Sequence, residues 1–137
     1  MKGFTLLELL IVVAVTGILL GIAVPRARLG LDRAVVRSAA TDVRATLGLA
    51  RTLALAGHAV IVVDVDAGSG VLRIRRGREV LARRAVGEAH GVEVRATRDS
   101  LSYDPYGMGR GAANLSVILR RGLAAETVFV SRLGRIR

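Results

Sequence analysis

The chain has no cysteine, no tryptophan and a single lysine among its 137 residues, and it has only two residues each of proline, tyrosine and phenylalanine. Without cysteine it forms no disulfide of its own, so packing and hydrogen bonds must hold the fold. With so few aromatic residues, base stacking is a poor explanation for any nucleic-acid binding. The other 20 basic residues are all arginine.

Acidic residues are also few, and 11 Asp and Glu against 21 Lys and Arg give a formal net charge of +10. A basic surface of this kind attracts polyanions such as DNA, anionic lipid head groups or acidic protein partners. The preference for arginine over lysine has an equally good explanation in codon bias, since Ala, Gly and Val are abundant too. Codon bias does not explain the net positive charge itself.

The longest apolar stretch lies at the N-terminus, where Phe4 to Val24 contains a single ionisable residue, Glu8. At about 1.5 Å per residue, a helix of this length spans a hydrocarbon core of roughly 30 Å. A secretory signal peptide is a poor alternative, because its apolar region is shorter and here Pro25 directly follows the run. A plain membrane anchor explains the length but not Glu8, and a carboxylate at that depth is costly and marks a function.

The order Gly3-Phe4-Thr5-Leu6-Leu7-Glu8 before this apolar run resembles the N-terminus of type IV prepilins and type II secretion prepseudopilins. The resemblance implies that a prepilin peptidase cuts between Gly3 and Phe4 and methylates the new amine of Phe4. It divides the chain into a leader peptide (1–3), a transmembrane helix (4–25) and a periplasmic pilin-like domain (26–137). A single span in the inner membrane is then expected, with the C-terminal domain in the periplasm or in a filament.

The charges that flank the span favour the opposite orientation. Lys2 is the only charge before it, whereas Arg26, Arg28 and Arg33 follow it. The positive-inside rule alone would therefore place the C-terminal domain inside the cell. The resemblance favours an N-terminus that faces the inside, because that family is inserted in this way.

Glu8 is the residue of this segment to which we assign a role in assembly. Cleavage leaves a positive amine on Phe4, and a lone carboxylate and a lone amine in the membrane are each costly. Pairing between Glu8 of an incoming subunit and Phe4 of its neighbour neutralises both charges and sets the subunits in register during assembly. The alternative is a Glu8 that snorkels to the membrane surface.

After Pro25 the helical pattern continues to about Gly57, a plausible cap for its end. One apolar face recurs at steps of three and four: Val36, Ala39, Ala40, Val43, Leu47, Ala50 and Ala54. Beyond it, β-branched runs and turn signals predict strands at 60–65, 71–75, 80–86, 92–96, 101–103, 115–119 and 127–130. We therefore expect an α+β, pilin-like fold in which a long N-terminal helix, membrane anchor first and amphipathic half second, packs on an antiparallel β-sheet with nothing helical after it.

Three segments of the C-terminal half resemble the GspH/FimT family of minor pseudopilins. They are the loop that begins Tyr103-Asp104-Pro105-Tyr106-Gly107 and continues as Gly109-Arg110-Gly111, the strand from Leu115 to Leu119, and the ending from Val128 to Arg137, which closes on Gly134-Arg135-Ile136-Arg137. Phenylalanine is commoner than tyrosine at the first position of this loop in that family. The resemblance implies a structural and assembly role as a minor pilin or pseudopilin in a type II secretion or type IV pilus filament. Its partners would be the peptidase and other minor and major pilins or pseudopilins, and the sequence leaves the choice of machine open.

A second function follows from the basic C-terminus, which resembles that of FimT-type members implicated in DNA uptake during natural transformation. Alternation along an extended segment would place Arg135 and Arg137 on one side. Contacts of this kind would be made to the phosphates of double-stranded DNA and would depend on salt. The residues expected to contribute are Arg132, Arg135 and Arg137, helped by Arg110, Arg120 and Arg121. The alternative is a solvated basic tail.

No pattern in the sequence indicates an enzyme, a cofactor or a metal site. His58 and His90 stand apart without metal-ligand spacing, so capping or surface roles are the default. The spacing Asp64-x-Asp66-x-Gly68 lacks the remaining ligands of a calcium loop, and a hairpin turn explains it better.

Overall fold

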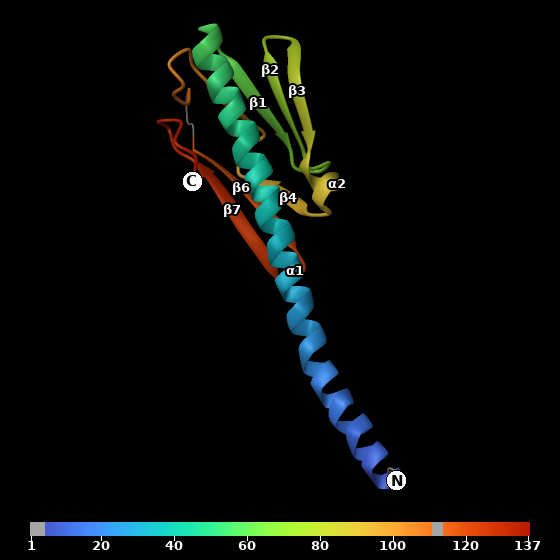
Figure 1. Cartoon of the computed structure of the whole chain (residues 1–137). Helices are drawn as coiled ribbons and strands as arrows, with labels where there is room; N and C mark the ends of the chain where they lie inside the picture. Colours follow the sequence, from blue (N-terminus) through green and yellow to red (C-terminus); the bar gives the residue numbers. More distant parts are fainter. Residues whose placement is uncertain (1–4, 111–113) are drawn as a thin grey trace.

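The computed structural model describes residues 5–110 and 114–137. A long helix extends well beyond an α+β domain whose strands pack along one side of its second half (Figure 1). The predicted cleavage site between Gly3 and Phe4 lies outside the described residues, as does Gly111 of the glycine-rich loop. The elements are α1 (Leu6–Gly57), β1 (Ile61–Asp66), β2 (Val71–Arg76), β3 (Glu79–Ala85), α2 (Val86–His90), β4 (Glu93–Ala96), β5 (Ser100–Tyr103), β6 (Leu115–Arg121) and β7 (Ala124–Val130).

Helix α1 is continuous over 52 residues and passes through Pro25 without a break. It ends at Gly57, where the sequence predicts its end. The residue that takes the left-handed conformation is His58, with φ 44°, and its backbone N–H donates to the carbonyl of Ala54. The cap is therefore His58 and not Gly57, so this detail of the prediction is wrong by one residue.

The predicted apolar face of α1 is the face that the domain covers. Its seven residues are all buried, from Val36 to Ala54, and none is more than 1% exposed. This face packs against strands of two different sheets, β1 and β2 on one side and β6 and β7 on the other. The helix is therefore the centre of the hydrophobic core, which confirms the predicted helix-on-sheet architecture.

The strands form two antiparallel sheets, not the single sheet that the sequence predicts. One has the order β3-β2-β1-β5 and the other the order β4-β6-β7. The predicted meander of the first three strands is confirmed. The chain leaves it through α2, a single turn of helix that the sequence pattern does not reveal and that the prediction assigns in part to a strand. Val86 begins α2 and is buried, and a helix of five residues is too short to show a periodicity.

Strands β6 and β7 are longer than predicted, by two and three residues, and a two-residue turn joins them. Gly122, the first residue of the turn, has φ 54°, whereas Leu123 has no positive φ. This combination fits a type II′ turn, which matches the twist of a hairpin. The start of β7, Ala124-Ala125, has little intrinsic strand preference, and the prediction places that strand's start too late for this reason.

Candidate functional site

The described chain begins with a reciprocal cap on α1. The backbone N–H of Glu8 donates to Oγ1 of Thr5 (3.3 Å), and the N–H of Thr5 donates to Oε2 of Glu8 (3.2 Å). Each side chain thus satisfies an N–H that the first helical turn leaves without an intrahelical partner. The carboxylate that the sequence assigns to assembly therefore also has a local partner. The Thr-x-x-Glu spacing is a sequence signal for this cap, and the predicted pairing of Glu8 with the Phe4 amine of a neighbour does not take it into account.

The first part of α1 presents apolar side chains in every direction. From Leu6 to Val24 all residues are exposed, and this stretch is long and apolar enough to cross a membrane by length and composition. The hydroxyl of Thr16 donates to the carbonyl of Val12 (2.7 Å), so this polar group is satisfied within the helix. A helix that is apolar all round needs either a protein or a lipid environment to cover it.

At the far end of the domain, Asp104 organises the loop that follows β5. Its Oδ1 accepts hydrogen bonds from the backbone N–H groups of Tyr106 and Met108, both at 2.9 Å. Its own backbone N–H donates to the carbonyl of Met108, and its carbonyl accepts from Gly107. The loop is therefore closed on itself by one aspartate, and Gly107 within it is buried.

The C-terminus folds back onto the end of β7 and is not a free tail. Phe129 and Arg137 exchange two backbone hydrogen bonds of 3.0 and 2.9 Å, and Ser131 N–H donates to the carbonyl of Arg135. Ile136 pairs with Val130 and packs against the core. The solvated-tail alternative is thus wrong about the backbone, which forms a short antiparallel return.

The glycine-rich loop and this C-terminal return contact each other. Gly109 N–H donates to the carbonyl of Arg132 (3.0 Å), and a Cβ on Gly134 would overlap the carbonyl oxygen of Gly107. Arg51 of α1 donates to the same Gly107 carbonyl at 3.0 Å. The loop and the chain ending, two of the segments that carry the GspH/FimT resemblance, therefore form one structural unit that is bonded to the end of α1.

Tyr103 lies beneath this unit. It is completely buried, and among the described residues its hydroxyl has no hydrogen-bond partner. Burial raises the pKa of Tyr103 to about 12, while the positive charge of Arg51 acts in the opposite direction. The hydroxyl is thus held neutral in an apolar setting.

The structure brings four of the six predicted arginines to one end of the domain. Arg135 and Arg137 are exposed on either side of the half-buried Ile136, so they share the outer face of the return, as alternation predicts. Arg132 lies in the turn before them, and Arg110 follows Gly109, which is bonded to that turn.

The remaining two, Arg120 and Arg121, lie at the opposite end of β6. Leu115 at the start of β6 pairs with Val130, whereas Arg121 pairs with Ala124. The guanidinium of Arg121 also forms hydrogen bonds within the domain, since its Nε donates to Asp32 (3.1 Å) and its Nη1 to the carbonyl of His90 (2.9 Å). These two arginines cannot belong to one site with the C-terminal group, and we correct the prediction in this respect.

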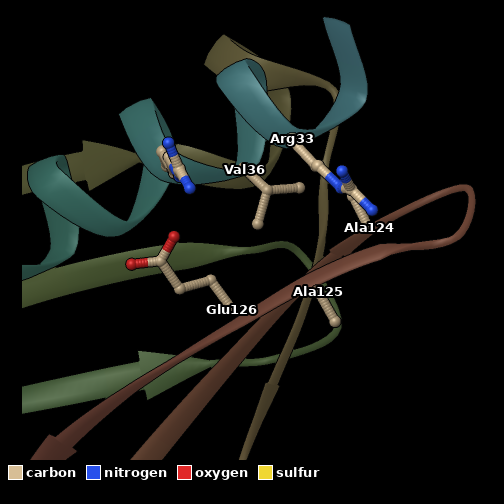
Figure 2. Close-up of a pocket in the computed structure, with 6 residues that line it drawn as sticks. Arg33, Val36, Ala124, Ala125 and Glu126 are labelled. Carbon is tan, nitrogen blue, oxygen red and sulfur yellow. The ribbon is translucent and has the colours of Figure 1, made fainter. Parts of the chain in front are cut away.

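Other charged side chains fasten elements to one another. Arg44 of α1 donates to Glu126 of β7 at 2.8 Å, next to an open pocket between α1 and the start of β7 where Arg33 lies over Ala124 (Figure 2). Hydrogen bonding to Asp64 raises the pKa of Arg75, and hydrogen bonds from Ser69 lower the pKa of Asp66. These partly exposed pairs are structural contacts between neighbouring segments, and they contribute little to stability compared with the hydrophobic core.

The second histidine has a structural role that the sequence does not predict. His90 Nε2 lies 2.8 Å from Oδ2 of Asp42, so this pair joins α2 to α1. His58, in turn, ends α1. Within residues 5–110 and 114–137, no group of three or more His, Cys, Asp or Glu side chains is placed to hold a metal ion.

Comparison with known proteins agrees with this arrangement. Residues 1–24 match the family model described as the prokaryotic N-terminal methylation motif. The chain is 34% identical over 156 residues to the pilin-like protein PilA1 of Thermus thermophilus, covering 99% of this chain and 97% of the relative. Its fold is similar to crystal structures of the type IV minor pilin FimU of Pseudomonas aeruginosa. The TM-scores are 0.64 and 0.62 at 16% identity, over 74% of this chain and 86% and 90% of those chains.

Proposed function

Since the chain belongs to the pilin-like proteins, we propose that it is a minor pilin or pseudopilin of the GspH/FimT type with a structural role in filament assembly. In this proposal α1 anchors it in the inner membrane by a single span, and the domain faces the periplasm until the subunit enters a filament. A prepilin peptidase would first cut between Gly3 and Phe4 and methylate Phe4.

The observation that carries the proposal is the form of α1. One helix is exposed on all sides and apolar except at Glu8 and Thr16 from Leu6 to Val24, and it buries one face against the sheets of the domain from Val36 onward. Such a helix has two environments built into one rigid element, lipid or neighbouring helices for the first part and its own sheets for the second. A subunit of this shape can exchange lipid for the helices of other subunits without unfolding.

Glu8 would provide the specificity of this exchange. In the isolated chain its carboxylate is occupied by Thr5 at the helix start. The Phe4 amine of a neighbouring subunit would offer it a full positive charge in a low-dielectric setting, where charge pairing is far stronger than in water. The capping hydrogen bonds hold the carboxylate at the membrane end of α1 until that partner arrives.

Glu8→Gln tests this role more sharply than a larger change. Glutamine can still form both hydrogen bonds of the cap but carries no charge. We expect normal membrane levels of E8Q and loss of its incorporation, measured by pull-down with neighbouring subunits, whereas Thr5→Ala should weaken the cap and retain incorporation. Incorporation of E8Q at the wild-type level would show that charge pairing is not the mechanism.

Processing provides an independent test. Mass spectrometry of the mature protein should find an N-terminus at N-methylated Phe4. Gly3→Val should accumulate the precursor, because the peptidase needs a small residue at the cut. An intact Met1 in membranes that contain the peptidase would contradict the whole proposal.

A second candidate function is binding of double-stranded DNA at the C-terminal return. It is supported by the exposed Arg135 and Arg137, which share one face of a segment fixed to β7, with Arg110 and Arg132 beside it. A fixed cationic face loses less conformational freedom on binding than a tail. Its contacts would be to phosphates and independent of base sequence.

The salt dependence of binding by the full chain in detergent separates this site from diffuse charge. Each lost phosphate contact makes the negative slope of log affinity against log salt shallower by about 0.9. The slope for the double variant R135Q/R137Q should therefore be shallower than that of the wild type by about 1.8. The control R78Q/R83Q removes the same charge from the β2–β3 hairpin and should leave the slope unchanged. Equal losses in both would indicate diffuse charge, and no binding by the wild type would leave only the structural role.

A further inference from the structure

The turn between β6 and β7 exposes a leucine where turns normally carry polar residues. Leu123 is 87% exposed, more than any other large apolar residue described in the chain. Beside it lies an open, mainly apolar groove lined by Val24, Pro25 and Leu29 of α1. Figure 1 shows this turn as the end of the domain nearest the apolar part of α1.

Two contacts hold the turn against α1. Arg121, the last residue of β6, donates to Oδ1 of Asp32 at 3.1 Å. Gly122 lies so close to the same carboxylate that a Cβ there would be 2.8 Å from Oδ2 of Asp32. The position of Leu123 along the helix is therefore fixed, and the negative charge of Asp32 is neutralised by its arginine partner.

That position corresponds to the surface of a membrane spanned by α1. The apolar run ends at Val24, and Leu29 lies five residues further, about 7.5 Å along the helix axis. The head-group region on each side of a bilayer is roughly 5–8 Å thick. With α1 upright in the membrane, the tip of the hairpin would therefore lie among the head groups, where a leucine side chain reaches the edge of the hydrocarbon.

The charges around the tip fit an anionic surface. Arg26 and Arg28 are exposed on α1 at this level, Arg28 lining the same groove as Leu123. Arg120 is exposed on β6 beside the turn. Cationic side chains that flank an exposed leucine are the composition of a surface that binds anionic lipid.

We propose that the β6–β7 turn is a second membrane contact, in which Leu123 inserts between lipid head groups and Arg26, Arg28 and Arg120 bind their phosphates. The inference rests on the proposed membrane-anchored state. It gives the cluster of arginines after the span a lipid-binding role on the side of the domain. Extraction of the subunit into a filament would then have to break this contact as well as remove the anchor.

A single-tryptophan experiment tests the proposal, because the chain contains no tryptophan of its own. The full chain carrying Leu123→Trp would be placed in nanodiscs of phosphatidylglycerol and phosphatidylcholine, whose two faces are equivalent so that orientation does not matter. Leu133→Trp is the matched control, since Leu133 is 70% exposed at the opposite end of the domain. The neutral quencher acrylamide reports exposure to water, and lipids brominated near the head group report contact with the membrane.

We expect acrylamide quenching of Trp in L123W to be several-fold weaker than in L133W, and quenching by brominated lipid to occur only in L123W. Replacing phosphatidylglycerol by phosphatidylcholine should reduce the difference. Equal access of acrylamide to both positions in a chain that has inserted would overturn the membrane contact alone. Protection of L123W only after neighbouring subunits are added would assign the tip to a subunit interface and overturn it too. A chain that does not insert would overturn the proposed function and this inference together.

Discussion

Gly134 lies against the carbonyl oxygen of Gly107, with no room between them for a side chain. The contact joins the C-terminal return to the glycine-rich loop, and Arg51 of α1 donates to the same carbonyl. One backbone oxygen thus connects three segments that are far apart in the sequence. Together with the backbone hydrogen bonds between Phe129 and Arg137, this contact fixes the placement of the arginines at the chain end, because Gly134 immediately precedes Arg135.

Gly134→Ala should destabilise the domain and release the return. Its φ of 72° costs a non-glycine residue about 1–2 kcal/mol, and the overlap with Gly107 adds to that cost. Gly77→Ala is the matched control, because Gly77 has φ 59° but no atom within 4 Å of the position that a Cβ would take. Thermal unfolding should show a larger loss for G134A than for G77A. Equal losses would mean that the Gly107 contact contributes nothing.

Tyr103→Phe should be neutral or stabilising. The hydroxyl is buried without a partner in the described part of the chain, and a buried unsatisfied polar group costs about 1–3 kcal/mol. The ring itself is completely buried, and phenylalanine would keep its apolar contacts. A clear loss of stability on denaturant unfolding would reveal a partner for the hydroxyl, such as a buried water.

The same residue should make the domain sensitive to alkali. Its pKa is about 12 in the folded chain and 10 as the ordinary value, so the unfolded state releases its proton first as pH rises. The contribution of neutral Tyr103 to the free energy of unfolding is therefore fully present below pH 10. It is lost progressively towards pH 12, by about 2–3 kcal/mol in total. Between about pH 9 and pH 12, the free energy of unfolding should fall more steeply with pH for the wild type than for Y103F. The same pH dependence in the wild type and in Y103F would show that Tyr103 is not the residue that makes the domain sensitive to alkali.

Leu47→Ala should cost about 2–5 kcal/mol, as expected when a fully buried leucine leaves a cavity. Leu49→Ala makes the same change two residues away on α1, where the side chain is 47% exposed, and should cost much less. Residues 28–137 suffice for the measurement, since every buried α1 residue lies at or after Val36. Similar costs for the two changes would mean that α1 packs through another face.

The sequence predicts well those parts of the fold that depend on a repeated residue pattern. The stripe from Val36 to Ala54 recurs over several helical turns, so its buried face and the helix end near Gly57 follow directly. The meander of β1, β2 and β3 is marked by its turn residues. These features are local, and each residue supports the assignment of its neighbours.

What the sequence does not predict depends on contacts between distant segments. The five residues of α2 divert the chain from one sheet to another, and their position depends on the close approach of Gly87 to Gly70. The separation of Arg121 from Arg135 follows from the pairing of β6 with β7, which places Arg121 next to the turn and Arg135 beyond the other end of the hairpin. The Thr5–Glu8 cap is an exception, because its spacing is local and readable, but the surrounding apolar run favours an interpretation from the charge of Glu8 alone.

The last prediction concerns how the β6–β7 turn is held on α1. Gly122→Ala should destabilise the domain for two reasons, the φ of 54° and the approach of the new Cβ to 2.8 Å from Asp32. Only the second depends on the carboxylate, so the cost of Gly122→Ala should be smaller in an Asp32→Ala background, where the steric part is removed. The backbone part, about 1–2 kcal/mol, should remain.

A double-mutant cycle on unfolding free energies measures the difference, since neighbouring sites deviate from additivity by about 0.5–3 kcal/mol. The salt bridge between Arg121 and Asp32, which Asp32→Ala also removes, is partly exposed and should contribute only about 0.2–1 kcal/mol to the free energy of unfolding. Additive effects of the two changes would show that the turn does not rest on Asp32. The position of Leu123 relative to the membrane would then have to be fixed by β6 and β7 alone.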